Sequence, residues 1–547
     1  MNFAARVYAH GAERPYQRAL VAPGPRQGDQ PSWRHMTFGR LTDRAKRLAA
    51  GFIKRGLTEG DRVMMLVPAG FEFFEVSLAL WQIGAVPVLI DPGMGLSGFL
   101  SCTAQIRPRV LIGIPRGMLL AAVRSGPFRS VEDRITVGGS TWFWGGATLD
   151  ACRSESPRTE LAPADVDTEA GVLFTSGSTG PAKGVRYTHG MFGTQAERIQ
   201  AMYDIVPGNL DVSCFLPFAM FSVAMGVTCV LPDMDFAKPA TAAPRAILEA
   251  VEEHGASQLV ASPAVLVRMA PWLAERGQEM PSLDRILTFG APIPRPLHEA
   301  FRTVLREGAA IHTPYGATEA LPVATIDGHT ILAETGARSA SGEGTCVGRP
   351  DESIEVRVLA ITDEPLATMA EATVLPPGEV GEITVRGVQV SREYKDRPDA
   401  NAASKVQDGD TFWHRMGDLG YLDDQGRLWF CGRKSHRVTL ADGRLRFPVP
   451  VEGIFNEHPA VRRSALVGVD GTAVLVVELN AGVTETPKLL DEIGALGRGH
   501  EVASDVTRLL VHPGFPVDRR HNAKIHRPEI AKWAAGRAGH PVRRGDA

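Results

Sequence analysis

The sequence has few cysteines, and they are not arranged to bind metal or to form a disulfide framework. They are Cys102, Cys152, Cys214, Cys229, Cys346 and Cys431, with no CxxC pair and no His/Cys cluster at zinc spacing. This spacing argues against a disulfide framework and against a structural metal site. We expect all six to be reduced and buried, because free cysteine packs as a small apolar residue.

An excess of charge of one sign is also missing. The 59 basic and 62 acidic residues are interspersed and give a formal net charge of -3, which provides no overall attraction to nucleic acid or to an anionic membrane. Polar residues interrupt the apolar runs before they reach the length needed to span a membrane. The stretch MNFAARVYAHGAERP lacks the cationic start and following apolar segment of a signal peptide. We expect a cytoplasmic protein with a small-molecule substrate, no nucleic-acid partner and no membrane span.

What the sequence does contain is an alternation of short apolar strands with helical patterns. At 547 residues it is too long for one ordinary domain. Apolar runs at 61–68 and 85–92 end in Pro, and the run at 257–266 contains Pro263. Their alternation with helical patterns predicts an α/β fold with a mostly parallel sheet. Antiparallel hairpins are predicted at 371–387 and at 420–433, the second with its turn at 424–426.

A change of composition marks a domain boundary. After Gly432 the chain becomes basic and rich in turns, and a smaller pattern follows with predicted strands at 464–469 and 473–479. We place the boundary at 432–436. The sequence has no internal repeats of solenoid period and no low-complexity tracts.

One glycine-rich segment, GVLFTSGSTGPAKGV at 171–185, has the composition of a phosphate-binding loop. An apolar strand leads into small hydroxyl residues, glycines and a lysine: Thr175, Ser176, Gly177, Ser178, Thr179, Gly180 and Lys183. Backbone N–H groups in such a segment can approach phosphate oxygens closely, and the lysine supplies a cation. The segment lacks the Gly-Lys-Ser/Thr of a Walker loop and the GxGxxG of a dinucleotide site. It predicts a polyphosphate site, and a plain Gly/Ser surface turn is the alternative that these residues alone leave open.

The same string resembles the phosphate-loop signature of the adenylate-forming superfamily of acyl-CoA synthetases, luciferases and peptide-synthetase adenylation domains. TPYGATEA at 313–320, which includes Tyr315 and Gly316, resembles its YGxTE motif. That resemblance assigns Thr318 to the α-phosphate and Glu319 to Mg²⁺, a hard cation that a carboxylate suits. FGAPIP at 289–294 resembles the loop that lines the adenine face, with Gly290, Ala291 and Pro292.

Three further motifs complete the resemblance. HRMGDLGYL at 414–422 resembles the motif whose aspartate, here Asp418, binds both ribose hydroxyls, and Arg433 matches the ribose-contacting arginine before the hinge. PVDRRHNAKIHR at 516–527 places the superfamily's catalytic lysine at Lys524, where it would stabilise charge as the pentavalent phosphorus forms. Taken singly, each of these residues could be an ordinary surface or capping residue. Their joint order and spacing over 171–527 favour the superfamily, which implies ATP and Mg²⁺ as cofactors.

The superfamily resemblance also implies a fold. It predicts a large N-terminal domain of two α/β/α subdomains with a small β-barrel at 1–432, a hinge at 433–436 and a mobile α+β C-terminal domain at 437–547 that contains Lys524. In the superfamily the C-terminal domain rotates about the hinge between adenylation and thiol transfer.

Departures from the acyl-CoA pattern concern the nucleophile that accepts the acyl group. Met220 stands where a histidine is common in the gating segment, the hinge residue is Ser435 in place of Asp or Lys, and Asn522-Ala523 precedes the lysine in place of Gly. Several longer strings, among them LPDMDFAKPAT and WHRMGDLGYLDDQGRLWFCGRK, resemble the β-lactone synthetases of bacterial long-chain olefin biosynthesis. The resemblance implies adenylation of a 2-alkyl-3-hydroxy fatty acid, whose own hydroxyl then displaces AMP.

An apolar channel would suit such a substrate. Its predicted lining is Phe215, Phe218, Met220, Phe221, Val223 and Met225, with simple core packing as the alternative. The base that takes the hydroxyl proton is not identifiable; His189, His312 and His414 lie near motifs, where a structural role is more common. The implied neighbours are other olefin-pathway enzymes: a thiolase-like condensing enzyme, a reductase and a β-lactone decarboxylase. A fatty acyl-CoA synthetase, an acyl-AMP ligase and a non-catalytic nucleotide-binding scaffold remain as alternative functions.

Overall fold

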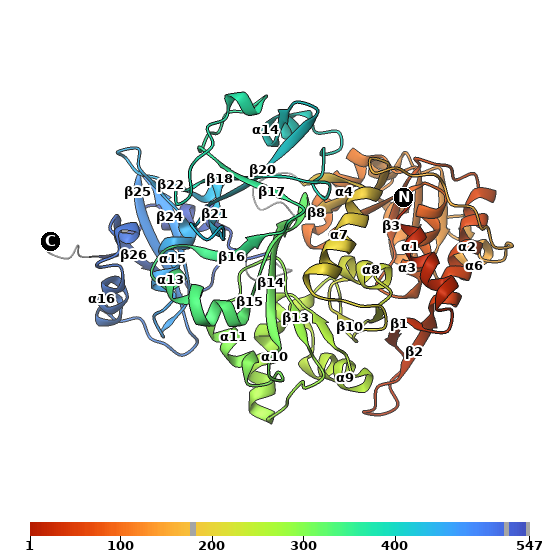
Figure 1. Cartoon of the computed structure of the whole chain (residues 1–547), viewed down its shortest axis with the longest axis horizontal. Helices are drawn as coiled ribbons and strands as arrows, with labels where there is room; N and C mark the ends of the chain where they lie inside the picture. Colours follow the sequence, from red (N-terminus) through yellow and green to blue (C-terminus); the bar gives the residue numbers. More distant parts are fainter. Residues whose placement is uncertain (176–181, 519–523, 543–547) are drawn as a thin grey trace.

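The computed structural model describes residues 1–175, 182–518 and 524–542, and the polypeptide runs from one end of an elongated molecule to the other (Figure 1). The first subdomain is built on a seven-stranded sheet with the strand order β7-β6-β5-β3-β4-β8-β9, in which only the last pair is antiparallel. Its strands are β3 (Arg62–Leu66), β4 (Val86–Ile90), β5 (Val110–Gly113), β6 (Asp133–Thr136), β7 (Ala147–Thr148), β8 (Glu169–Thr175) and β9 (Lys183–Thr188).

Helices cover both faces of this sheet, and the two faces have separate cores. One core includes α1 (Ala4–Glu13), α2 (Phe38–Lys54) and α3 (Phe71–Gln82), and the other includes α4 (Gly95–Ile106) and α5 (Pro115–Val123). Successive strand residues alternate between them, since Met65 packs in the first core and Leu66 against the second. The apolar runs at 61–68 and 85–92 form β3 and β4, as the sequence predicts.

The second subdomain is built on one part of a second, 14-stranded sheet. Its parallel part consists of β1 (Arg18–Pro23), β10 (Leu210–Ser213), β11 (Thr228–Val230), β12 (Gln258–Val260), β13 (Arg285–Leu287) and β14 (Ala310–Ala317), with antiparallel β2 (Trp33–Thr37) at one edge. The connecting helices are α7 (His189–Met202), α8 (Leu216–Ala224), α9 (Pro244–His254), α10 (Pro263–Arg276) and α11 (Arg295–Arg302). The run at 257–266 is therefore half strand and half helix, because Pro263 starts α10.

The same sheet continues into an antiparallel region at the place where a small barrel was expected. Strand β15 (Ala320–Asp327) pairs with β14 on one side and with β16 (Thr345–Pro350) on the other. Beyond it lie β17 (Glu355–Leu359), β18 (Gly381–Arg386), β19 (Lys405–Asp408), β20 (Thr411–Leu422) and β21 (Leu428–Arg433). The β20–β21 hairpin confirms the prediction for 420–433.

The hairpin prediction at 371–387 is wrong in its pairing. Strand β18 is antiparallel, but its partners are β17 and β20, and residues 371–380 belong to the long connection after β17. The Pro-Pro-Gly sequence at 376–378 turns the chain inside this connection, where the prolines cannot donate ladder hydrogen bonds.

The remainder of the chain forms separate sheets. A small pair, β22 (Val438–Thr439) and β23 (Leu445–Arg446), precedes a four-stranded sheet of β24 (Val461–Val469), β25 (Thr472–Leu479), β26 (Val506–Val511) and β27 (His540–Pro541). The helices of this part are α15 (Pro448–Phe455), α16 (Pro487–Leu496) and α17 (Arg527–Ala534), and it has its own apolar core. The large sheet ends with β21 at Arg433, within the segment where the composition changes.

The structure also bears on the cysteines and on the question of a membrane span. All six cysteines are buried and free, which confirms their prediction as reduced packing residues. Among the described residues, no helix is both long and apolar enough to cross a membrane.

Candidate active site

A cavity of about 2270 Å³ lies where the carboxyl ends of the parallel strands from both subdomains meet the C-terminal domain. This is where ligands bind in open α/β sheets. Many of the residues predicted from sequence line it: Phe215, Phe218, Met220, Phe221, Gly290, Ala291, Pro292, Tyr315, Gly316, Thr318, Glu319, Asp418, Arg433 and Lys524. Ser176, Gly177, Ser178, Thr179 and Gly180 lie outside the described residues, and Thr175 ends β8.

Thr318 and Glu319 form the tight connection between β14 and β15. Ala317 pairs with Ala320, so these two residues are the whole turn and are presented at the cavity wall. The hydroxyl of Tyr187 donates to the backbone oxygen of Thr318 at 2.7 Å, and the hydroxyl of Tyr394 donates to Glu319 Oε1 at 2.6 Å. The backbone N–H of Ser391 donates to the Glu319 carbonyl at 2.7 Å. Thr318 is therefore held by β9, and Glu319 is held by the connection that follows β18.

Tyr394 is the centre of a small cationic cluster behind Glu319. Lys183 Nζ lies 4.7 Å from the centroid of its ring, and Lys405 Nζ lies 5.5 Å away. Burial lowers the pKa of Lys183 below its usual value and lowers that of Lys405 to about 7. Burial, followed by the Glu319 carboxylate, raises the pKa of Tyr394, so its phenol stays protonated and remains a donor. Lys183 is not among the described residues that line the cavity.

The donor set around Glu319 fits Mg²⁺ in a nucleotide site. Only one carboxylate oxygen of Glu319 is bonded to Tyr394, and no described residue donates to the other. Among the described residues, no group of three or more His, Cys, Asp or Glu side chains is placed to hold a metal ion by itself. A single fixed carboxylate is sufficient for Mg²⁺ when phosphate oxygens and water supply the other ligands.

We expect Tyr394→Phe to weaken Mg²⁺ use by about 10- to 100-fold, because loss of a hydrogen bond to a metal ligand has effects of this size. The measurement is the Mg²⁺ concentration that gives half-maximal pyrophosphate release. Tyr421→Phe is the matched control, since Tyr421 donates to the Glu343 carbonyl and is not among the cavity-lining residues. An unchanged Mg²⁺ requirement in Tyr394→Phe would show that Tyr394 does not position Glu319.

Asp418 and Arg433 face each other across the β20–β21 hairpin. Arg433 Nη1 donates to Asp418 Oδ1 at 2.7 Å, and Tyr315 donates to Oδ2 at 2.7 Å. Burial, followed by the Asp418 carboxylate, raises the pKa of Tyr315, which keeps this donor protonated. A carboxylate has about four lone-pair sites, so Asp418 can accept two more hydrogen bonds from a diol.

Lys524 enters the same cavity from the C-terminal domain. Its backbone N–H donates to Asp518 Oδ1 at 2.8 Å, and the Asp518 N–H donates to the Lys524 carbonyl at 3.1 Å. An isolated bridge pairs Val517 with Ile525 beside these two hydrogen bonds. The exposed side chain thus extends from a fixed backbone position into the cavity.

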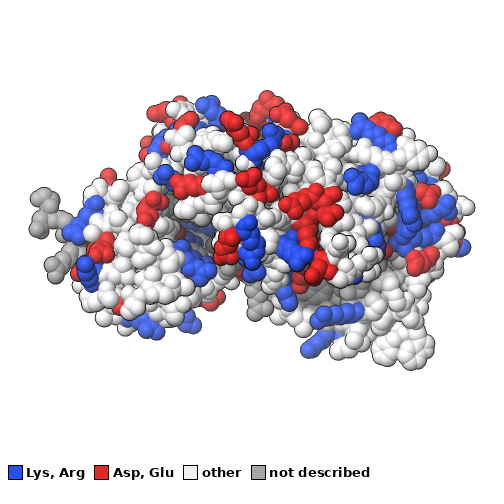
Figure 2. All heavy atoms as spheres, turned by 90° about the horizontal axis from the view of Figure 1, so that it is seen from below, with Lys and Arg blue, Asp and Glu red and all other residues white. Residues whose placement is uncertain are grey.

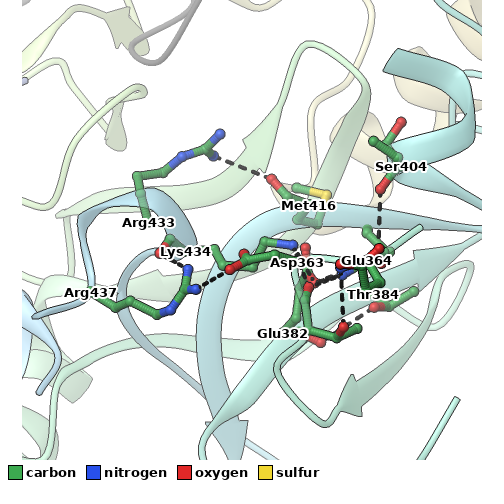
Figure 3. A network of polar contacts seen from close by, with 12 residues as sticks. Asp363, Glu364, Glu382, Thr384, Ser404, Met416, Arg433, Lys434 and Arg437 are labelled. Atoms are coloured by element: carbon green, nitrogen blue, oxygen red, sulfur yellow. Dashed lines mark hydrogen bonds and ion pairs between the residues drawn. The ribbon is translucent and has the colours of Figure 1, made fainter. Parts of the chain in front are cut away.

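The connecting segment after β21 is attached to the antiparallel region by two ion pairs (Figure 3). Lys434 Nζ donates to Glu382 Oε2 at 3.0 Å, and Arg437 pairs with Asp363. Glu382 is buried and also accepts from Arg415 at 2.6 Å. These contacts define one orientation of the C-terminal domain, in which Lys524 lines the cavity.

Four of the six residues predicted to line an apolar channel lie at the cavity wall. Phe215, Phe218, Met220 and Phe221 line the cavity at the start of α8. Val223 and Met225 do not: they are 0% and 1% exposed and pack in the N-terminal core. The reason is the helical period, which turns the end of α8 away from the cavity.

The three histidines near the motifs occupy structural positions. His189 Nδ1 accepts from the backbone N–H of Phe3 at 3.0 Å, His312 stacks edge-on with Tyr203, and His414 contacts Lys405. Among the described residues, His436 and His458 line the cavity, and burial lowers the pKa of His436 to about 4. His436 and Tyr394 were not predicted. No local motif distinguishes them, and only the tertiary structure brings them to the site.

Comparison with known proteins agrees with this geometry. The family model described as AMP-binding enzyme matches residues 7–395. The chain is 42% identical to the olefin β-lactone synthetase of Xanthomonas campestris, covering 98% of this chain and 97% of that protein. It is 41% identical to the enzyme of the same description from Stenotrophomonas maltophilia, with 98% of each covered. Its fold is similar to that of the amide bond synthetase McbA from Marinactinospora thermotolerans, with TM-score 0.78 and 23% identity over 97% of this chain and 99% of that one. The chain therefore belongs to the AMP-binding enzyme family and is an AMP-forming ligase of the adenylate-forming superfamily.

Proposed function

We propose that this enzyme activates a long-chain 2-alkyl-3-hydroxy fatty acid with ATP and Mg²⁺ as its acyl adenylate. The substrate's 3-hydroxyl then attacks the activated carbonyl, which gives a β-lactone and AMP after pyrophosphate has left. The observation that supports this most strongly is the 41–42% identity, over nearly the whole chain, to two olefin β-lactone synthetases.

The shape of the cavity supports a substrate with two hydrocarbon chains. One group of lining residues, including Leu89, Trp81 and Met220, belongs to the α3 and α8 side of the first sheet. A second group, including Ile90, Phe99 and Leu120, belongs to the opposite side under α4 and α5. The cavity therefore extends around the carboxyl edge of the sheet toward both apolar layers. A 2-alkyl-3-hydroxy acid has one chain for each direction, with its carboxylate between them.

In the proposed reaction, different cavity residues hold ATP, hold Mg²⁺ and stabilise the charge that develops. Asp418 and Arg433 would hold the ribose, Glu319 would hold Mg²⁺, and Thr318 would contact the α-phosphate. Mg²⁺, when bound, neutralises charge on the phosphates. Lys524 would stabilise the negative charge that develops at the α-phosphate while the carboxylate attacks it. Apolar walls exclude water from the adenylate.

Ring closure requires orientation more than further chemical activation. The hydroxyl and the carbonyl belong to one molecule, and well-oriented intramolecular attack can reach an effective molarity of about 10⁵ M. A cavity that fixes both hydrocarbon chains would restrict rotation about the bond between the carbons that bear the carboxylate and the hydroxyl. In this proposal the C-terminal domain, residues 437–547, rotates about 433–436, and a second orientation serves product release.

The test is product analysis with purified enzyme, ATP, Mg²⁺ and a long-chain 2-alkyl-3-hydroxy acid, with and without coenzyme A. We expect a neutral lactone, AMP and pyrophosphate in equal amounts, at a rate that coenzyme A does not change. AMP formation only when the thiol is present, with a thioester as product, would instead assign the enzyme as an acyl-CoA synthetase.

A further inference from the structure

A short loop between β6 and β7 exposes aromatic side chains to solvent. It contains Trp142, Phe143 and Trp144 in succession, and the first two are 89% and 65% exposed. Trp144 is the anchor: its indole N–H donates to Thr136 Oγ1 at 2.9 Å, and its ring packs against the core beneath α4 and α5. The loop is therefore fixed at one aromatic residue and presents the other two.

Glycines with positive φ lie on both sides of the aromatic residues in this loop. Gly138, Gly139, Gly145 and Gly146 bracket the aromatic residues and have φ of +69°, +75°, +73° and +84°. Side chains at these positions would be strained, so the glycines permit two tight turns around the exposed pair. An added Cβ at Gly139 would come within 2.9 Å of the Pro115 side chain, which places the loop against the start of α5.

Helix α5 extends the apolar surface. Its Met118 and Ala121 are buried, while Leu119 and Val123 are 47% and 70% exposed. Arg116, Gly117 and Leu120 of the same helix line the active-site cavity, as does the half-exposed Leu96 of α4. We call Leu96, Leu119, Val123, Trp142 and Phe143 the α5 apolar surface; Leu96 and three residues of α5 line the cavity.

The charge around this surface differs from that of the whole chain. Residues 107–134 contain six arginines against two acidic residues, a local net charge of +4, whereas the chain as a whole has -3. Arg116, Arg124 and Arg129 are exposed, and none of them forms an ion pair with another described residue. On the face seen in Figure 2, by contrast, basic and acidic side chains are intermingled. The even overall balance that argues against membrane attraction therefore does not describe this segment.

We propose that the α5 apolar surface docks on an anionic lipid bilayer. Tryptophan is favoured at the boundary between headgroups and acyl chains, and exposed apolar residues beside unpaired cations are typical of proteins that lie in that interface. Each arginine near an anionic surface adds attraction that salt screens. The adjoining cavity gives a reason for such docking, because a long-chain acid partitions into lipid and could enter without crossing water. This reason rests on the proposed function, whereas the docking itself does not.

The experiment is co-sedimentation of the full-length enzyme with vesicles of phosphatidylglycerol and phosphatidylcholine, and with vesicles of phosphatidylcholine alone. We expect the wild type to bind the anionic vesicles more tightly, and binding to fall as salt is raised. Trp142→Ser/Phe143→Ser should reduce the partition coefficient by about tenfold or more. Arg124→Gln/Arg129→Gln should reduce binding to the anionic vesicles and leave binding to the phosphatidylcholine vesicles unchanged. Tyr16→Ser/Val206→Ser, which alters exposed apolar residues elsewhere, is the matched control and should bind as wild type does.

Three results would overturn the proposal. The first is that the wild type does not bind vesicles, and the second is that Trp142→Ser/Phe143→Ser binds them as well as Tyr16→Ser/Val206→Ser does. The third is that Trp142→Ser/Phe143→Ser keeps its vesicle binding but has a changed sedimentation coefficient in vesicle-free solution. The last would assign the surface to contact with another protein molecule. Pyrophosphate release by each variant with detergent-dispersed acid should match the wild type, which verifies folding and keeps this test separate from that of the proposed function.

Discussion

Lys524→Ala should lower the rate of pyrophosphate release by about 10³-fold and leave ATP affinity nearly unchanged. One preorganised donor to a developing oxyanion contributes about 10²–10³ in rate, and an ammonium supplies full charge in addition. The Lys524 side chain is exposed, and its backbone is hydrogen-bonded to Asp518. Its removal should therefore not disturb the fold. The measurements are single-turnover pyrophosphate release and ATP binding by calorimetry.

Lys532→Ala is the matched control for that variant. Lys532 is an exposed lysine on α17 in the same domain, and it does not line the cavity. It should behave as the wild type does in both assays. If Lys524→Ala released pyrophosphate at the normal rate, or if both variants lost activity equally, Lys524 would not be the group that assists adenylation.

Asp418→Asn should weaken ATP binding by about 10²-fold. The variant loses the charge that would accept from two ribose hydroxyls, and hydrogen bonds to a charged group contribute about 1.5–3 kcal/mol each. It also leaves Arg433 without its carboxylate partner at 2.7 Å. Breaking a buried pair in this way costs about 3–5 kcal/mol, and the partial exposure of Arg433 should place the loss of unfolding free energy below that range.

Two measurements separate the effects on binding and on stability. ATP dissociation constants are determined below the unfolding transition, and thermal denaturation is followed without nucleotide. Asp424→Asn changes an exposed aspartate in the turn of the same hairpin and should leave both quantities at wild-type values. An Asp418→Asn variant that bound ATP normally while unfolding earlier would restrict Asp418 to a structural role.

The sequence predicts those parts of the fold that depend on local patterns. The runs that became β3, β4, β24 and β25 are continuous and apolar, and Asp424 to Gly426 specifies the turn between β20 and β21. Pairing between distant strands has no such local signal. This is why β18 was assigned a neighbour in sequence, although its partners β17 and β20 lie on either side of long connections.

In the site, too, the polar residues could be found from local motifs, whereas the apolar walls could not. Thr318 and Glu319 come from one motif and Asp418, Arg433 and Lys524 from three others. All five line one cavity. The apolar walls follow from tertiary structure: the sequence pattern of α8 cannot say which of its uniformly apolar residues face the cavity, and so Val223 and Met225 were misplaced. Tyr394 was missed because its contact with Glu319 joins positions 75 residues apart.

If the substrate's own hydroxyl accepts the acyl group, a 2-alkyl-3-hydroxy acid and the matched 2-alkyl acid without the hydroxyl should give different products in single turnovers without any thiol. We expect pyrophosphate release from both acids. AMP and lactone should form from the hydroxy acid alone, and the other acid should remain as an acyl adenylate. Equal AMP release from the two acids, or retention of both adenylates until coenzyme A is added, would contradict this mechanism.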